Sequence, residues 1–157
     1  MTRSAEINAR VLAAYGSWEH PTHHFVSPET VRSLTLLAAR ILPGDVLWAD
    51  RTDLNYDVCV TLSLSRAAAQ AELLLSLVGP YATLLDVDSS AGDTLSVVDA
   101  DDMRWADVSV MLAQAGFETL SAEELGRRTP IKLSLCIDSG CTVFNALFRD
   151  QYATKLG

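Results

Sequence analysis

The segment His20-Pro21-Thr22-His23-His24 contains every histidine of the chain and could supply two or three imidazoles to a metal ion. Only Glu19 lies beside it as a carboxylate, and no HExxH pattern places two histidines on one helical face. We therefore interpret the segment as a solvated loop and predict no metal site. A small metal-dependent enzyme that uses the His20–His24 loop stands as an alternative function.

The three cysteines, Cys59, Cys136 and Cys141, could bind zinc or respond to redox state. Structural zinc sites favour closely spaced pairs and four ligands. Here Cys136 and Cys141 are widely spaced, and the sequence offers no clear fourth ligand. An odd number of cysteines is also a poor basis for disulfides. We expect reduced cysteines that act as small packed side chains, and we expect no cofactor.

Catalytic motifs give no firm match elsewhere in the chain. It contains no GxSxG, GxxxxGK[ST] or GxGxxG pattern. Residues 86–93 resemble a calcium-binding loop, but the glycine is displaced by one position and Val97 stands where a bidentate glutamate is required. These residues are more typical of a turn stabilised by Asp, Ser and Gly. The sequence therefore predicts a binding protein rather than an enzyme.

Negative charge is concentrated in residues 50–107. That segment holds eleven acidic residues and three arginines, so its net charge of −8 equals that of the whole chain. A surface of one sign attracts oppositely charged partners and speeds their encounter. The isoelectric point near 4.7 and the scarcity of lysine argue against nucleic acid or an anionic membrane as a partner. The alternative explanation is a solvated surface that only keeps the chain soluble.

This charge distribution predicts a partner-binding surface made of two acidic groups with aromatic anchors. Aromatic residues surrounded by charge are typical of protein–protein hot spots, although each could equally belong to the core. The first acidic group comprises Asp50, Asp53 and Asp57, and the second comprises Asp86, Asp88, Asp93, Asp99, Asp101 and Asp102. The candidate anchors are Trp48, Tyr56 and Trp105.

The length of 157 residues predicts a single domain over residues 1–157. No apolar run reaches the roughly 20 residues that span a bilayer, and the start of the chain lacks the pattern of a signal peptide. We expect a cytoplasmic protein without membrane contact, present as a monomer or a weak dimer.

Five helices are expected from apolar spacing, caps and breakers: over 4–18, over 28–41, from Ser65 to Gly79-Pro80, from Asp99–Asp102 to Gly116, and from the Ser121-x-x-Glu124 capping box to Gly126. Ser27 offers a capping hydroxyl to the second helix, and Pro28 suits its first position. The fourth helix is expected to bury Met103.

Strands are expected where polar and apolar residues alternate, or where a polar turn separates two apolar runs: 46–48, 56–64, 81–87, 94–98, 131–137 and 142–149. The last segment also fits helical spacing, but its β-branched residues favour a strand. This hairpin-rich order predicts an α+β fold, with a mostly antiparallel sheet of about five to six strands and helices packed largely on one face.

The chain resembles bacterial immunity proteins, which neutralise toxins delivered between competing cells. It shares with them a small, acidic α+β chain without catalytic motifs. In its last third, Ala115-Gly116-Phe117, Ser121–Leu125 and Thr142–Phe148 are similar to the helix-to-final-strand ending of some of these families. No site residue can be carried over, because the contact surfaces of such proteins diverge.

The resemblance implies an inhibitor that binds a basic toxin domain, often a nuclease, and occludes its substrate groove. Acidic side chains can imitate phosphates there and accelerate capture. We therefore expect a binding protein that neutralises a basic bacterial toxin domain by electrostatically guided occlusion. A homo-oligomeric scaffold subunit, in which the acidity serves only solubility, is the second alternative.

Overall fold

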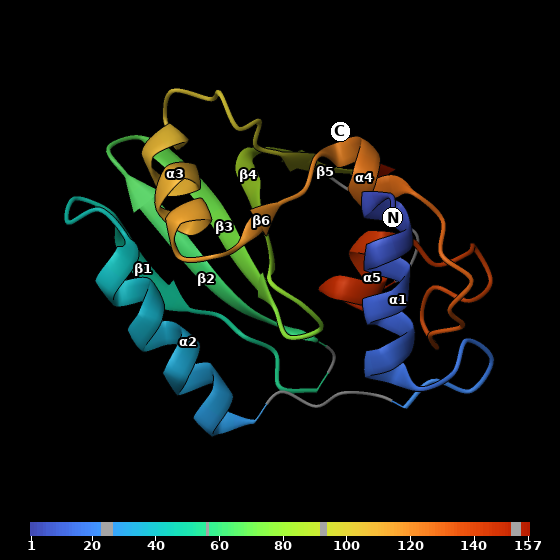
Figure 1. Cartoon of the computed structure of the whole chain (residues 1–157). Helices are drawn as coiled ribbons and strands as arrows, with labels where there is room; N and C mark the ends of the chain where they lie inside the picture. Colours follow the sequence, from blue (N-terminus) through green and yellow to red (C-terminus); the bar gives the residue numbers. More distant parts are fainter. Residues whose placement is uncertain (23–26, 56, 92–93, 152–154) are drawn as a thin grey trace.

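Figure 1 shows the computed structural model, which describes residues 1–22, 27–55, 57–91, 94–151 and 155–157. Two helices come first, α1 (Arg3–Tyr15) and α2 (Pro28–Ile41). The predicted start of α2 is confirmed, because the Ser27 hydroxyl accepts a hydrogen bond from the backbone N–H of Thr30 and Pro28 occupies the first turn.

A sheet follows, formed mainly by β1 (Leu47–Asp50), β2 (Cys59–Arg66), β3 (Ala69–Ser76), β4 (Tyr81–Ala91) and β5 (Thr94–Val97). These strands lie in chain order, each antiparallel to the next. The two-residue strands β6 (Glu118–Thr119) and β7 (Lys155–Leu156) pair in parallel with β4 and β5. The predicted α+β fold is therefore confirmed, and the sheet has seven strands within the described residues.

The predicted third helix is wrong, because residues 65–76 contain the end of β2, a tight turn and the return strand β3 of a hairpin. β2 and β3 pair along their whole length. Cys59 lies opposite Ser76 at one end of the hairpin, and Arg66 lies opposite Ala69 at the other. Ala and Leu favour helices, but Leu73, Leu74 and Leu75 are all buried, with alternate side chains on opposite faces of the sheet. A strand buried on both faces is a continuous apolar run, which periodicity does not distinguish from a helix.

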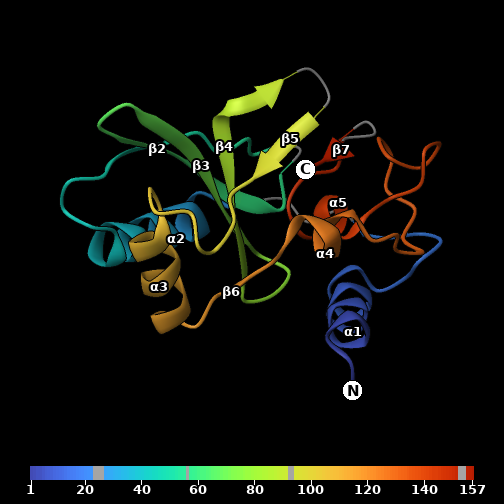
Figure 2. The same ribbon diagram turned by 90° about the horizontal axis from the view of Figure 1, so that it is seen from above.

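Helices cover the two faces of the sheet unequally (Figures 1 and 2). α2 and α3 (Ala106–Gln114) share one apolar cluster with Leu62, Leu73 and Leu84. Leu74 and Leu85 point to the opposite face and join a second cluster with α1 and α5 (Val143–Leu147). The prediction that helices pack on one face therefore holds for α2 and α3. α1 and α5 cover part of the other face.

The start of α3 differs from the prediction. Its N-cap position is Trp105, which makes no side-chain capping hydrogen bond, so the acidic residues of Asp99–Asp102 do not cap the helix. Met103, expected in the core, is 89% exposed. Val108 and Leu112, which the same helical spacing places on the buried side, are buried.

Two strand predictions near the C-terminus are also wrong. Residues 131–137, all of them described, contain no strand. The last predicted strand is a short helix, α5 (Val143–Leu147), which begins with a capping box between Thr142 and Asn145. This box keeps the helical register that buries Phe144 and Leu147. α4 (Ala122–Gly126) begins with the predicted box from Ser121 to Glu124.

Candidate functional site

The first acidic group contains two exposed members. Asp50 ends β1 and Asp53 lies in the following loop, and neither forms an ion pair with a described residue. Each carboxylate accepts a backbone hydrogen bond from two residues further on, Thr52 and Asn55 respectively. This turn geometry leaves the charge of both aspartates open to solvent or to a partner.

Asp57, the third member of that group, belongs to a buried charge network. It is 6% exposed, lies 3.6 Å from Nε of Arg149 and accepts a hydrogen bond from the Thr61 hydroxyl. Arg149 also donates to Glu72 at 2.9 Å. Burial raises the pKa of Asp57 and outweighs the opposing effect of the guanidinium. The structure therefore places Asp57 inside the protein, where it cannot form the exposed contact that the sequence predicted.

Arg104 joins two members of the second acidic group. Its Nη2 lies 2.7 Å from Asp86 on β4 and 2.8 Å from Asp102 in the loop before α3. Burial acts to raise the pKa of Asp86, but hydrogen bonds from Arg104 and from the backbone N–H of Asp88 outweigh it and lower the pKa. Hydrogen bonds from Arg104 lower the pKa of Asp102 as well. Both aspartates are ionised, and Arg104 pairs with both but offsets one of their two negative charges.

The other described members of the second group are exposed. Asp88, Asp99 and Asp101 form no ion pair with a described residue, and Asp93 lies outside the described residues. The residues called here the free aspartates are Asp50, Asp53, Asp88, Asp99 and Asp101. They are exposed and have no counterion in the described part of the chain.

The aromatic anchors separate in the same way. Trp105 is completely buried, with the Arg66 guanidinium 5.7 Å from its ring centroid, so it belongs to the core and offers no contact surface. Trp48 is 38% exposed on β1 and remains accessible. Tyr56 lies outside the described residues.

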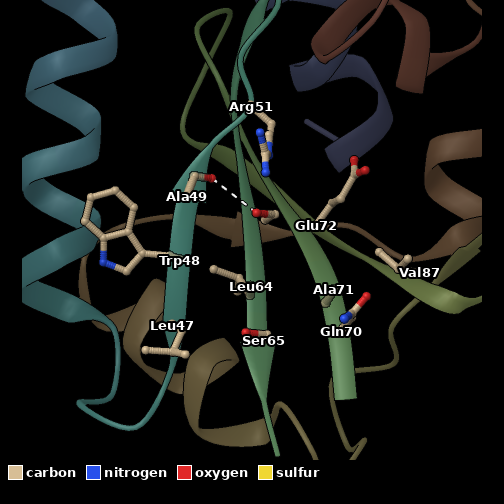
Figure 3. A pocket seen from close by; sticks show the side chains of 11 residues that line it. Leu47, Trp48, Ala49, Arg51, Leu64, Ser65, Gln70, Ala71, Glu72 and Val87 are labelled. Atoms are coloured by element: carbon tan, nitrogen blue, oxygen red, sulfur yellow. Dashed lines mark hydrogen bonds between the residues drawn. The ribbon is translucent and has the colours of Figure 1, made fainter. Parts of the chain in front are cut away.

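Part of one sheet face is left uncovered over β1 to β4 and forms an open groove of about 590 Å³ (Figure 3). Its floor carries small side chains, among them Ala49, Ser63 and Ser65. Arg51 and Glu72 lie toward one end of the groove, and Leu47 lies toward the other. Its lining thus combines small and apolar side chains with the charged residues Arg51 and Glu72.

Metal and thiol chemistry find little support in the described residues. No group of three or more His, Cys, Asp or Glu side chains among them could hold a metal ion. His20 is exposed, and His23 and His24 lie outside the described residues. Burial raises the pKa of the Cys59 thiol to about 12, so this thiol is protonated near neutral pH and unreactive.

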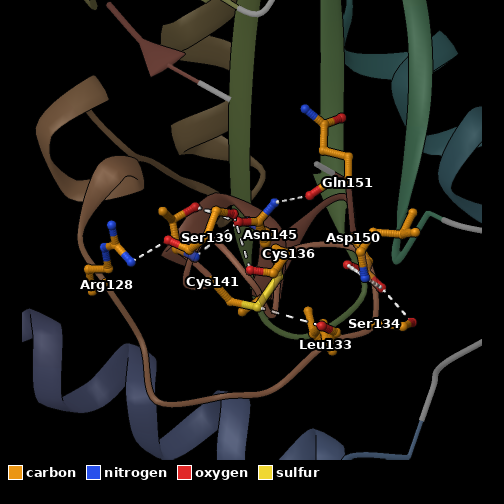
Figure 4. The surroundings of a disulfide bond; sticks show 12 residues. Arg128, Leu133, Ser134, Cys136, Ser139, Cys141, Asn145, Asp150 and Gln151 are labelled. Atoms are coloured by element: carbon orange, nitrogen blue, oxygen red, sulfur yellow. Dashed lines mark hydrogen bonds between the residues drawn. A yellow bond between two sulfur atoms is a disulfide. The ribbon is translucent and has the colours of Figure 1, made fainter. Parts of the chain in front are cut away.

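The expectation of reduced cysteines is wrong for two of the three, because Cys136 and Cys141 form a disulfide (Figure 4). Their segment has no regular secondary structure, and Asp150 accepts hydrogen bonds there from the Leu135 backbone and the Ser134 hydroxyl. An odd cysteine count does not exclude one bonded pair, and a short separation permits a local loop. The sequence signal for this disulfide was the separation of 5 positions between Cys136 and Cys141.

Three arginines that the sequence analysis does not single out decide which acids are paired. Arg66 binds Asp45 and Asp107, just as Arg104 and Arg149 each bind two carboxylates. The available signal was the position of Arg66 and Arg104 inside an acidic segment, where an arginine has many possible partners.

Comparisons of the chain with protein-family models, curated proteins and solved structures found no match. None of the helices in the described part of the chain has the length and apolar character needed to cross a membrane.

Proposed function

We propose that this chain is a binding protein that captures a basic protein partner through its free aspartates. The supporting observation is their contrast with the other acids. The free aspartates are exposed without a counterion in the described residues, whereas Asp57, Asp86 and Asp102 are paired with arginines. The free aspartates therefore present negative charge that no arginine offsets to an approaching partner.

The partner in this proposal is a bacterial toxin domain, of which a nuclease is the leading case, and the chain neutralises it by covering its active site. A nuclease groove must bind phosphates, so it is complementary to exposed carboxylates. The similarity to immunity proteins supports this identity through acidity and the lack of a catalytic motif. The C-terminal topology adds nothing, because the expected final strand is α5.

A capture experiment tests the proposal. Immobilised protein should retain a basic protein from a lysate of its own host at low salt and release it at high salt, because salt screens exposed charge pairs. A matched bait with asparagine at the free aspartates should lose most of that protein. The captured protein, produced alone, should lose its activity when one equivalent of the chain is added. Equal capture by both baits, or activity that the chain does not reduce, contradicts the proposal.

The proposal places the inhibitor in the cytoplasm, where a delivered nuclease meets nucleic acid. Disulfides are rare in that compartment, so the Cys136–Cys141 pair provides an independent test. Thiol trapping in intact cells measures whether the pair is bonded, as in the structure, or reduced, as a cytoplasmic location requires. A bonded pair would place the chain in an oxidising compartment instead.

A further inference from the structure

An apolar groove of about 390 Å³ lies between α2 and the loop after β1, and is called here the α2 groove. Val31 and Leu36 line it from α2, and Leu54 lines it from the loop. Leu36 is 60% exposed and Leu54 is 43% exposed. Exposed apolar side chains that converge on one groove are typical of an interaction site.

Two further side chains belong to this region. Trp48 lies on the same face of β1 as Asp50, and Figure 3 shows its ring pointing toward α2. Thr35 lines the groove, and its buried hydroxyl has no hydrogen-bond partner among the described residues.

Carboxylates outnumber cations around the α2 groove. Asp50 and Arg32 line it, one charge of each sign, and Asp53, Glu29 and Arg51 are sequence neighbours of lining residues, so carboxylates exceed cations by one. Arg32 is the cation that lines the groove among the described residues. Arg51 lies in the open groove over the sheet (Figure 3), not in the α2 groove.

The region of Asp99 and Asp101 offers no comparable anchor. Its aromatic candidate, Trp105, is buried beneath Arg66. The adjoining depression, which Asp99 lines, is smaller, about 150 Å³. These aspartates can attract a basic partner, and Met103 is exposed beside them, but Met103 does not line that depression, whereas Leu36 and Leu54 both line the α2 groove.

We infer that the α2 groove receives an apolar side chain of the partner, and that Lys or Arg residues flanking this side chain bind Asp50 and Asp53. The inference rests on the proposed function and assigns the contact centre to the first acidic group. The free aspartates of the second group then act at longer range, on the rate of encounter.

A synthetic peptide of alternating Lys and Leu pairs is the probe, with a Glu and Leu peptide of the same order as its control. The Lys peptide should shift the backbone amide resonances of residues 28–36 and 50–54 in two-dimensional ¹⁵N NMR spectra. The Glu peptide should shift neither set. Shifts confined to residues 86–104 or to the open sheet groove, or no shift at all, would overturn the inference.

Matched variants test the two components separately. Leu36→Ser with Leu54→Ser should weaken binding of the Lys peptide about tenfold, and Asp50→Asn with Asp53→Asn should weaken it at low salt only. Val110→Ser with Ile137→Ser is the control, because those apolar residues are similarly exposed but lie elsewhere. Equal weakening by the control pair would show general stickiness and contradict the site.

The affinity of the captured partner for the groove variant distinguishes this inference from the proposed function. A basic toxin domain that binds the Leu36→Ser and Leu54→Ser variant as tightly as the original chain overturns the inference and leaves the proposed function intact. Failure to capture any basic protein, combined with peptide binding in the α2 groove, removes the proposed function while supporting the chemistry of the groove.

Discussion

At the scale of single residues, arginine pairing decides which acids a partner can reach. Asp57 and Asp86 are buried beside arginines, whereas Asp50 and Asp99 are exposed without a counterion in the described residues. A sequence shows these aspartates as equivalent, because pairing depends on strands brought together by the fold. The acidity of the surface could therefore be predicted from the sequence. Which of its aspartates a partner can reach could not.

Loss of Arg149 should destabilise the protein strongly. Arg149→Met leaves Asp57 and Glu72 without their counterion in a largely buried site, which costs about 3 kcal/mol. Urea unfolding at pH 7 measures the loss. Adding Asp57→Asn should restore part of it, because the buried group is then neutral.

The control for that prediction is Arg127→Met. Arg127 pairs with Glu123 on an exposed helix surface, so its loss should change the free energy of unfolding by less than about 0.5 kcal/mol. Similar losses for Arg127→Met and Arg149→Met would show that the buried network carries no special weight.

Arg104 should make stability depend on pH. The pKa values of Asp86 and Asp102 are lowered from 3.8, so their ionised forms stabilise the folded state above pH 3.8. This stabilisation is lost as the pH falls through the lowered folded-state values. Arg104→Met should therefore be less stable than the original chain at pH 7, and the difference should narrow below pH 3.8. Urea unfolding at several pH values measures it, and a constant difference would contradict the assignment.

At the scale of elements, the strongest sequence signals were local caps and polar turns. Ser27 and Ser121 correctly predicted the starts of α2 and α4. The polar segment after residue 87 predicted the β4–β5 hairpin, but residues 88–91, expected in the turn, extend β4. The β2–β3 hairpin was missed because its turn, Ala67-Ala68, contains no Gly, Asn or Pro. The capping box of α5 was missed because Asn145 stands where Glu or Gln is usual.

The β2–β3 turn gives a prediction on backbone strain. Ala67 has φ 49°, a left-handed conformation that disfavours a Cβ atom. Ala67→Gly should raise the free energy of unfolding by about 0.5–1 kcal/mol, because the relieved strain exceeds the added freedom of the unfolded chain. Ala68→Gly is the matched control, because Ala68 has no positive φ, and it should be destabilising. Urea unfolding compares the two, and equal effects would exclude strain at Ala67.

At the scale of the whole molecule, two sets of helices pack against the two faces of one sheet. α2 and α3 pack on one face, whereas α1, α5 and the irregular C-terminal segment cover part of the other and leave the open groove. Alternation and hairpin order were enough to predict α+β. They could not predict the partial cover, because it depends on α5 and on a disulfide-linked segment that the sequence presents as strands.

The disulfide should stabilise that segment. Closing the short loop between Cys136 and Cys141 contributes about 2 kcal/mol by restricting the unfolded chain. Urea unfolding with and without a phosphine reductant should show this loss. The Cys136→Ser and Cys141→Ser double variant should be insensitive to reductant, and Cys59→Ala should keep the sensitivity of the original chain. Reductant-independent stability of the original chain would contradict a structural role.

The central claim, that free aspartates guide a basic partner, is tested most directly by the association rate with the captured protein at low and high salt. Asp99→Asn with Asp101→Asn should slow association about threefold to tenfold at low salt, leave dissociation unchanged and match the original chain at high salt. Glu123→Gln with Asp138→Asn removes two exposed acids from outside the acidic segment and should leave the rate unchanged. Equal rates for all three proteins at low salt would contradict the account.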